Sequence, residues 1–226
     1  MSPKGIDDLS SVPFFAELDK ELLKKMAHTA AIQRYAVDEI VILQGDPCAS
    51  MCIVQEGWLK EIITSPAGRE QTIRLLRAGD VFNEIGLLAE CRNPVTVQAL
   101  EDSTLWVFER KKMQKLMDEH PHLCRVITRN LAERVIQLMK LIEDLSLRTV
   151  KSRMARLLLE NAIEGVISRR RWMTQTEMAA RLGTVLDVVN RTLNSLENDG
   201  LLKVERQKIQ LLEIKLLEEL ANLEDQ

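Results

Sequence analysis

Residues 174–199 read TQTEMAARLGTVLDVVNRTLNSLEND, and the carboxyl-terminal part of the chain is organised around them. Thr174 followed three residues later by Glu177 forms a capping box, which predicts the start of a helix. Gly183 predicts a tight turn after this short helix, and a second helix is expected from about Val185. Two helices joined by a short turn that contains Gly form a helix-turn-helix, whose second helix enters the major groove of DNA. The alternative is an ordinary helical hairpin.

Polar side chains occupy the outward positions of the second predicted helix, and apolar side chains occupy its inward positions. Arg can pair bidentately with guanine, Asn with adenine, and Asp can accept a hydrogen bond from cytosine. A basic turn between two apolar runs follows the helix and predicts a wing, whose tip would contact phosphate. The candidate DNA-binding residues are Thr174, Gln175, Thr184, Val185, Leu186, Asp187, Asn190, Arg191, Asn194, Arg206 and Lys208.

The distribution of charge supports a separate basic unit around this motif. The whole chain has a net charge of −3, which by itself argues weakly against a nucleic-acid partner. Residues 148–208 nevertheless hold 12 basic and 7 acidic side chains, a net charge of +5, whereas residues 1–147 hold 18 and 22, a net charge of −4. The last 18 residues hold one Lys and five acids. This asymmetry predicts two units with different partners, although the basic run from Arg169 to Arg171 is also typical of a solvated loop.

A long helix with a narrow apolar seam is predicted just before the basic unit. It starts after Pro121 and extends to about Leu147, with apolar residues spaced by four, three, four and three. This spacing is that of a coiled coil, and we favour a homodimer interface over packing against the same chain. The predicted interface residues are Leu131, Val135, Leu138, Ile142 and Leu145.

Short β-prone runs separated by turn residues lie between Tyr35 and Glu109, which predicts an antiparallel sandwich or barrel. The predicted strands are 40–43, 51–54, 58–64, 71–76, 95–99 and 104–108, and a helix over 19–31 with Asp19 as its N-cap precedes them. The expected fold class is α+β. The expected parts are a β-rich domain at 1–118, the long helix at 119–147 and the domain with the helix-turn-helix at 148–226.

Several classes of protein are excluded by composition and pattern. No run of about 18 apolar residues predicts a transmembrane helix, and the first eight residues lack the apolar stretch of a signal peptide. Four cysteines are too few for a disulfide framework. No nucleophile–base pair, Walker loop or metal-binding His pair is present in the sequence. We therefore expect a cytoplasmic protein that has no membrane partner and is not an enzyme.

The order of these parts resembles that of the bacterial cyclic-AMP receptor protein and fumarate-nitrate regulator (Crp/Fnr) family. The similarity extends from Phe14 and Phe15 to the wing, and its most specific residues are 44–46, Gly57, 78–82, 84–88, 99–103 and 174–200. The resemblance implies an N-terminal β-roll sensor, which is a double-stranded β-helix like a cyclic nucleotide-binding domain, then a dimerisation helix and a C-terminal winged helix-turn-helix. It also implies transcription regulation by a homodimer on double-stranded DNA, with activation and contact to RNA polymerase, while repression stays open.

The effector pocket that the resemblance implies differs from that of cyclic-nucleotide binders. Asn83 stands where those proteins have the Gly of a Gly-Glu pair, and Asn93-Pro94 stands where they have Arg-Ser or Arg-Ala. The long helix offers Leu138 and Met139 in place of hydroxyl side chains. A buried cyclic phosphate needs a charge-assisted partner, so cyclic AMP is disfavoured. The implied pocket residues are Asn83, Glu84, Ile85, Gly86, Leu87, Arg92, Asn93, Pro94, Val95, Leu138 and Met139.

The recognition helix also differs from the family pattern. Leu186 stands where relatives that bind a TGTGA-type half-site have their first Arg, whereas Arg191 keeps their last Arg and Asp187 is a shorter acid. An apolar side chain can touch a thymine methyl group but cannot make the bidentate contact to guanine. We therefore expect a shifted operator that is still palindromic, with half-sites about one helical turn apart.

The signal itself stays open between several cofactors. The candidate haem ligands are His28, His120 and His122. A redox or metal sensor would use Cys48 or Cys91, although a free Cys is usually a small buried hydrophobic residue. Three residues separate Cys48 from Cys52, which is a poor match to a zinc site. Iron–sulfur relatives have a cluster of cysteines before the β-roll, whereas no cysteine precedes Cys48 in this sequence. The alternative function is an effector-independent regulator or interaction module with a degenerate β-roll.

Overall fold

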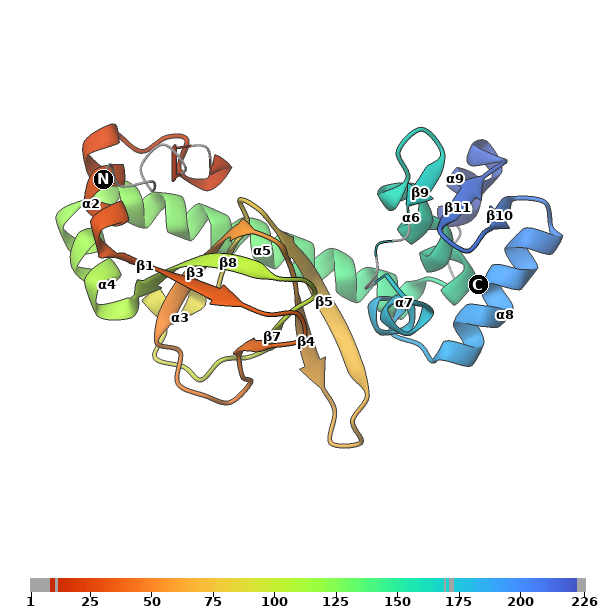
Figure 1. The fold of residues 1–226 in the computed structure, drawn as a ribbon, viewed down its shortest axis with the longest axis horizontal. Coiled ribbons are helices and arrows are strands. Elements are labelled where there is room, and N and C mark those ends of the chain that lie inside the picture. The colour runs from red at the N-terminus through yellow and green to blue at the C-terminus, as the bar shows by residue number, and fades with distance from the viewer. Residues whose placement is uncertain (1–8, 11, 169, 171–172, 223–226) are drawn as a thin grey trace. The chain divides into compact units, whose positions relative to one another are not determined.

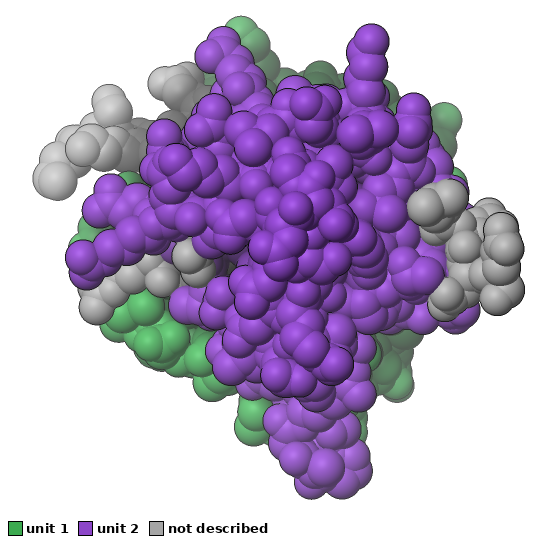
Figure 2. Space-filling view, turned by 90° about the vertical axis from the view of Figure 1, so that its right-hand side faces the viewer, with its two compact units in different colours: residues 1–63, 73–137 green, residues 64–72, 138–226 purple. Residues whose placement is uncertain are grey.

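The computed structural model describes residues 9–10, 12–168, 170 and 173–222, and its contacts divide the chain into two compact units. The first unit comprises residues 1–63 and 73–137, and the second comprises residues 64–72 and 138–226 (Figure 2). Two sequence-based expectations concern residues outside the described part of the chain. They are the lack of a signal peptide in the first eight residues and the basic run that includes Arg169 and Arg171.

Two four-stranded sheets form the roll of the first unit, in the orders β1-β8-β3-β6 and β2-β7-β4-β5 (Figure 1). Apolar side chains that alternate along the strands meet between the two sheets, among them Val54, Leu59, Phe82 and Leu105. The predicted antiparallel architecture is therefore confirmed. The strands are β1 Ala30–Tyr35, β2 Ile40–Ile42, β3 Ser50–Glu56, β4 Trp58–Thr64, β5 Glu70–Arg77, β6 Val81–Phe82, β7 Thr96–Ala99 and β8 Ser103–Glu109.

Helices cover the outer face of the sheet that contains β1, β3 and β8. Met26, Met113 and Ile127 come from three helices and are buried against sheet residues such as Met51 and Trp106. The first unit therefore has a second core, which lies between this sheet and the helices. The 3-10 helix is Pro13–Phe15, and the helices are α2 Lys20–Thr29, α3 Ile85–Leu88, α4 Arg110–Glu119 and α5 Pro121–Leu147.

The helix predicted over 19–31 starts as expected but ends earlier. The side chain of Asp19 accepts a hydrogen bond from the backbone N–H of Leu22 at 2.8 Å, which confirms the N-cap. The helix ends at Thr29 because Ala30 is extended and pairs with Phe108 of β8. Strand β1 was absent from the prediction since its residues are mostly exposed and carry no period-two apolar pattern.

The second unit contains the predicted helix-turn-helix and wing. Val189, Leu193 and Leu196 of α8 are buried together with Met154 of α6 and Met178 of α7. Strands β10, β11 and β9 form a three-stranded antiparallel sheet, so the predicted hairpin gains a third strand from an earlier part of the chain. The elements are α6 Val150–Asn161, β9 Val166–Ser168, α7 Gln175–Leu182, α8 Leu186–Asn198, β10 Leu202–Val204, β11 Lys208–Leu211 and α9 Ile214–Ala221.

Helix α5 carries the predicted apolar seam and is 27 residues long. Leu131 and Leu145 are partly buried, whereas Leu138 is exposed, and Val135 and Ile142 leave 55% and 63% of their surface exposed. Exposed apolar side chains at this spacing are typical of a helix–helix interface. In the part of the chain that the structure describes, no helix is both long and apolar enough to cross a bilayer.

Candidate nucleic-acid interface and sensor site

Thr174 and Gly183 fix the two ends of α7, the first helix of the motif. The Thr174 hydroxyl accepts a hydrogen bond from the backbone N–H of Glu177 at 3.1 Å, so Thr174 is the N-cap that the sequence predicts. Gly183 ends the helix with φ of 63°, in the left-handed region where side chains other than Gly are strained. The Thr184 N–H then donates to the Ala179 carbonyl at 3.0 Å. Interactions between residues close in sequence thus determine the turn between α7 and α8, and with it the direction of α8.

The polar side of α8 faces solvent. The exposed residues at and near its start are Val185, Leu186, Asp187, Arg191 and Asn194. Arg191 Nε lies 3.2 Å from Asp187 Oδ2, one turn earlier, and the two side chains are 72% and 79% exposed. The pair holds the guanidinium in solvent on the outward face of the helix. Asn190 differs from the prediction of an outward side chain, because its Oδ1 atom is buried and has no hydrogen-bond partner among the described residues.

A groove of about 420 Å³ lies where the start of α7, the start of α8 and the wing meet. It brings together four predicted residues from three separate stretches of the chain. Three further lining residues, Arg170, Met173 and Thr176, were not predicted, although Arg170 belongs to the basic run that the sequence shows. The groove is lined by Arg170, Met173, Thr174, Gln175, Thr176, Leu186 and Arg206.

The described residues of the wing include three cations, Lys203, Arg206 and Lys208, and one carboxylate, Glu205. Glu205 lies 3.6 Å from Lys203 Nζ and 3.6 Å from Lys208 Nζ, so a single carboxylate serves both lysines. Arg206 is exposed and forms no ion pair with any described residue. Of the two predicted phosphate contacts, Arg206 is therefore the more available to a phosphate, because the charge of Lys208 is partly compensated by Glu205.

The implied effector-pocket residues lie in several different environments of the structure. Glu84 and Asn93 are buried, whereas Ile85, Leu138 and Met139 are exposed. The remaining residues divide in the same way: Gly86 and Leu87 are buried, Asn83 and Val95 are half-buried, and Arg92 and Pro94 are exposed. Leu87 belongs to the core beneath the helices and not to the interior of the roll. The structure thus does not present these residues as one uniform lining.

Arg92 and Asn83 are engaged with the backbone. Arg92 Nη1 donates to the Gly45 carbonyl at 2.7 Å, and its residue is exposed. Asn83 Nδ2 donates to the Ser50 carbonyl at 2.8 Å, and the backbone of Asn83 has φ of 61°. The guanidinium of Arg92, one of the implied pocket residues, therefore ties this loop to the turn that contains Gly45.

An ion cluster inside the first unit was not predicted from the sequence. Glu61 Oε1 accepts from Arg74 at 3.2 Å, and Glu61 Oε2 accepts from Arg134 at 2.5 Å. The Glu61 side chain is 6% exposed, and those of Arg74 and Arg134 are 20% and 16% exposed. Glu61 shares a strand face with Leu59, a residue of the roll core, and this inward position of an acid in an apolar strand was the signal that could have revealed the cluster.

Glu84 lies near this cluster but is not a member of it. Its residue is 4% exposed, and no ion pair joins its side chain to a described residue. Burial raises the pKa of Glu84 above its usual value, although the nearby charges of Arg74 and Arg134 act in the opposite direction. A carboxyl with a raised pKa next to two engaged guanidiniums marks this region as a candidate sensor site.

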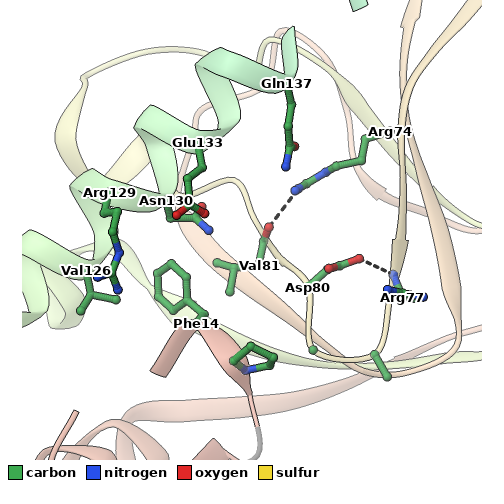
Figure 3. A pocket seen from close by; sticks show the side chains of 13 residues that line it. Phe14, Arg74, Arg77, Asp80, Val81, Val126, Arg129, Asn130, Glu133 and Gln137 are labelled. Carbon is green, nitrogen blue, oxygen red and sulfur yellow. Dashed lines mark hydrogen bonds between the residues drawn. The ribbon is translucent and has the colours of Figure 1, made fainter. Parts of the chain in front are cut away.

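The first unit contains a pocket between α5, the turn that joins β5 to β6, and Phe14 (Figure 3). Its volume of about 500 Å³ falls within the range of small-molecule sites. Arg74 points from β5 towards the Val81 carbonyl and donates to it at 2.9 Å. The lining contains none of the implied pocket residues and consists of Pro13, Phe14, Arg74, Arg77, Ala78, Gly79, Asp80, Val81, Val126, Arg129, Asn130, Glu133 and Gln137.

The candidate haem and metal ligands are dispersed. His28 Nδ1 lies 2.7 Å from the Lys24 carbonyl, His122 Nε2 lies 3.1 Å from the Glu17 carbonyl, and His120 Nε2 lies 3.4 Å from Lys25 Nζ. Among the described residues, no group of three or more His, Cys, Asp or Glu side chains is arranged to hold a metal ion. The four cysteines are free thiols.

Comparison with known proteins matches both units. Residues 32–120 match the model of a cyclic nucleotide-binding domain, and residues 152–220 match that of a Crp-like helix-turn-helix domain. The chain is 27% identical to the HTH-type transcriptional regulator Cmr of Mycobacterium tuberculosis, over 84% of this chain and 75% of that protein. It is also 27% identical to the cyclic AMP receptor protein of Thermus thermophilus, over 83% and 86% of the two chains.

A solved structure shows the same architecture. The crystal structure of a transcriptional regulator of the Crp/Fnr family from Eubacterium rectale superposes with a TM-score of 0.76. The sequences are 26% identical, and the match covers 93% of this chain and 98% of the other. The similarity therefore extends through both units and the helix between the two matched domains.

Proposed function

Since the chain belongs to the Crp/Fnr family of DNA-binding transcription regulators, we propose that it binds a palindromic operator as a homodimer and responds to a signal received in its β-roll. The observation that carries the proposal is the face of α8 on which Asp187 and Arg191 stay in solvent while the opposite face is buried. A helix of this kind can enter the major groove and place Arg191 against a base edge.

The other contacts follow from the groove and the wing. Leu186 supplies an apolar surface at the start of α8, which suits a thymine methyl group. Arg206 and Arg170 border the same groove and suit the phosphate backbone. The exposed apolar residues of α5, such as Val135 and Ile142, supply the dimer interface and therefore set the two-fold symmetry of the operator.

We propose that the signal is not cyclic AMP. A bound cyclic phosphate needs a cation without a partner, whereas Arg92 is engaged with the Gly45 carbonyl, and Arg74 and Arg134 are both paired with Glu61. Displacing Glu61 would leave a carboxylate buried without a partner, which is costly. The Thermus thermophilus relative is named a cyclic AMP receptor protein. Cyclic AMP is therefore the effector that the test has to exclude.

A binding selection on random duplexes tests the DNA-binding part of the proposal. The expected product is a palindrome with half-sites about one helical turn apart, whose half-site differs from TGTGA at the position that faces Leu186. Fluorescence anisotropy at several salt concentrations should then show a steep loss of affinity with salt. Recovery of the unmodified TGTGA half-site, or of no preferred sequence, contradicts the proposal.

A thermal-shift screen tests the sensor part. A ligand at 100 times its dissociation constant stabilises the folded protein by about 2.7 kcal/mol, which is readily detected as a raised melting temperature. Cyclic AMP should give no shift at millimolar concentration. The second candidate function, a regulator with no effector, is favoured by the pairing of both Arg74 and Arg134 with the internal carboxylate of Glu61, and it predicts no shift with any metabolite, nucleotide or haem.

A further inference from the structure

Two segments of the first unit place a pair of cysteines face to face. Pro47 and Arg92 form an antiparallel bridge, and the N–H of Cys48 donates to the Cys91 carbonyl at 3.3 Å beside it. In this register Cys48 is directly opposite Cys91. Opposite residues of an antiparallel pair lie with their Cα atoms about 4.5–5.5 Å apart and their side chains on the same side. A disulfide requires a Cα separation of about 4.4–6.8 Å, so the backbone already has the geometry of a bridged pair.

The two thiols also approach one another. Burial is the main cause that raises the pKa of Cys48, and the charge of the neighbouring Cys91 thiol group raises it further. The Cys48 thiol donates to Asn83 Oδ1 at 3.1 Å and is packed on Gly86, where an added Cβ would lie 2.1 Å from its sulfur atom. Cys48 is thus a buried and positioned thiol, whereas Cys91 is partly exposed.

We propose that Cys48 and Cys91 form a reversible disulfide when the protein reacts with a hydroperoxide. The more exposed Cys91 thiolate attacks the peroxide oxygen, which yields a sulfenic acid and releases hydroxide or an alkoxide. The Cys48 sulfur then attacks the sulfenic sulfur, the S–S bond forms, and water leaves. Two thiols are oxidised by two electrons, one peroxide is reduced, and a thiol reductant reverses the reaction.

The other two cysteines are poor partners for this reaction. Burial raises the pKa of Cys52 to about 12, and its side chain belongs to the closed core of the roll. Cys124 lies on α5 and packs against the separate core beneath the helices. Cys91 and Cys124 are both partly exposed, but only Cys91 lies opposite Cys48. Within this pair, a peroxide in solution meets the partly exposed Cys91 before the buried Cys48.

The bridge would act on the loop that the resemblance assigns to the effector pocket. Arg92, Asn93 and Pro94 directly follow Cys91, and the bridge would tie them covalently to the turn after β2. The chemistry of the bridge does not depend on the proposed function. Only its use as a redox signal in transcription rests on that function.

Peptide mapping of the full chain tests the proposal. The reduced protein is treated with hydrogen peroxide, free thiols are alkylated, and the protein is digested with trypsin without reductant. Cys48 and Cys52 lie in the tryptic peptide 35–60, and Cys91 lies in the peptide 78–92. The expected product is these two peptides joined, a species that disappears on reduction and whose fragment ions place the bond on Cys48. Because this assignment is made on the wild-type protein, it does not depend on a variant that folds.

Matched variants sharpen the result. The joined species should be lost in Cys91→Ala and Cys48→Ala and kept in Cys52→Ala and Cys124→Ala. Formation should accelerate as pH rises, since the thiolate fraction of Cys48 increases. A bond within peptide 35–60, a joined species that persists in Cys48→Ala, or oxidation of Cys91 to sulfinic acid with no joined species overturns the proposal.

Discussion

The two units use the same pair of side-chain types in opposite ways. In the first unit, Glu61 is buried between Arg74 and Arg134, and in the second unit Asp187 and Arg191 pair in open solvent on α8. Removing one partner of a buried pair leaves an uncompensated charge, whereas an exposed pair contributes little to folding. The burial of the charged groups therefore distinguishes their roles. The buried ion cluster joins the roll to α5, whereas the exposed pair on α8 remains accessible to a ligand.

The largest expected effect comes from Glu61→Gln. The substitution keeps the size of the side chain but leaves two largely buried guanidiniums, 20% and 16% exposed, without their carboxylate, so the free energy of unfolding should fall by about 3–5 kcal/mol. Urea unfolding followed by tryptophan fluorescence measures it, in a Trp172→Phe background so that Trp58 and Trp106 of the first unit report the transition.

Glu17→Gln is the matched control for this change. Glu17 forms an equally direct pair with Arg129 at 2.8 Å, but both side chains are 52% exposed. The control should leave the urea midpoint unchanged. Equal midpoints for the two variants would show that burial does not distinguish these pairs and would contradict the comparison.

The next effect concerns DNA and not stability. Arg191→Ala removes the outward guanidinium of α8, and loss of a bidentate base contact should weaken operator binding by about 1–3 kcal/mol and relax specificity at one base pair. Fluorescence anisotropy with the selected operator and its single-base variants measures both quantities. The urea midpoint of the second unit should stay at the wild-type value, because the Asp187–Arg191 pair is exposed.

Arg206→Ala is the control that separates phosphate contact from base contact. Its loss should weaken all duplexes to a similar extent and reduce the slope of log affinity against log salt by about 1. If Arg191→Ala also weakened all duplexes equally, Arg191 would be a phosphate contact and the proposed role of α8 would be wrong.

The contrast between the units also explains what the sequence could predict. The helix-turn-helix depends on neighbours in the chain, such as the Thr174 cap and the Gly183 turn, and local chemistry of this kind is visible in the sequence. The ion cluster joins residues from β4, β5 and α5, and no local pattern pairs Glu61 with Arg134. The cysteine pair was missed for the same reason, because only the register of two separated segments brings Cys48 opposite Cys91.

A smaller effect should appear in the pH dependence of stability. Burial raises the folded-state pKa of Glu84, so the folded protein holds this proton at pH values where the unfolded chain has released it. Stability therefore increases as pH falls through the raised pKa and stops increasing below the ordinary Glu value. Glu84→Gln should be more stable than the wild type above this window, with the difference closing inside it. Melting temperatures between about pH 4 and pH 8 measure this, and parallel curves would contradict it.

The smallest effect is expected for Asp199→Asn in the second unit. Lys151 donates to Asp199 Oδ2 at 2.8 Å, and this hydrogen bond is the main cause that lowers the pKa of Asp199. A lowered pKa means that the contribution of the pair is present above the ordinary Asp value and is lost as pH falls through the folded-state pKa. Because about half of the Asp199 side chain is exposed to solvent, the melting temperatures of variant and wild type should differ slightly at neutral pH and coincide in about 1 M salt. A difference that survives such salt would mean that an exposed pair acts like the buried Glu61 cluster, and the distinction between inward and outward charges would then fail.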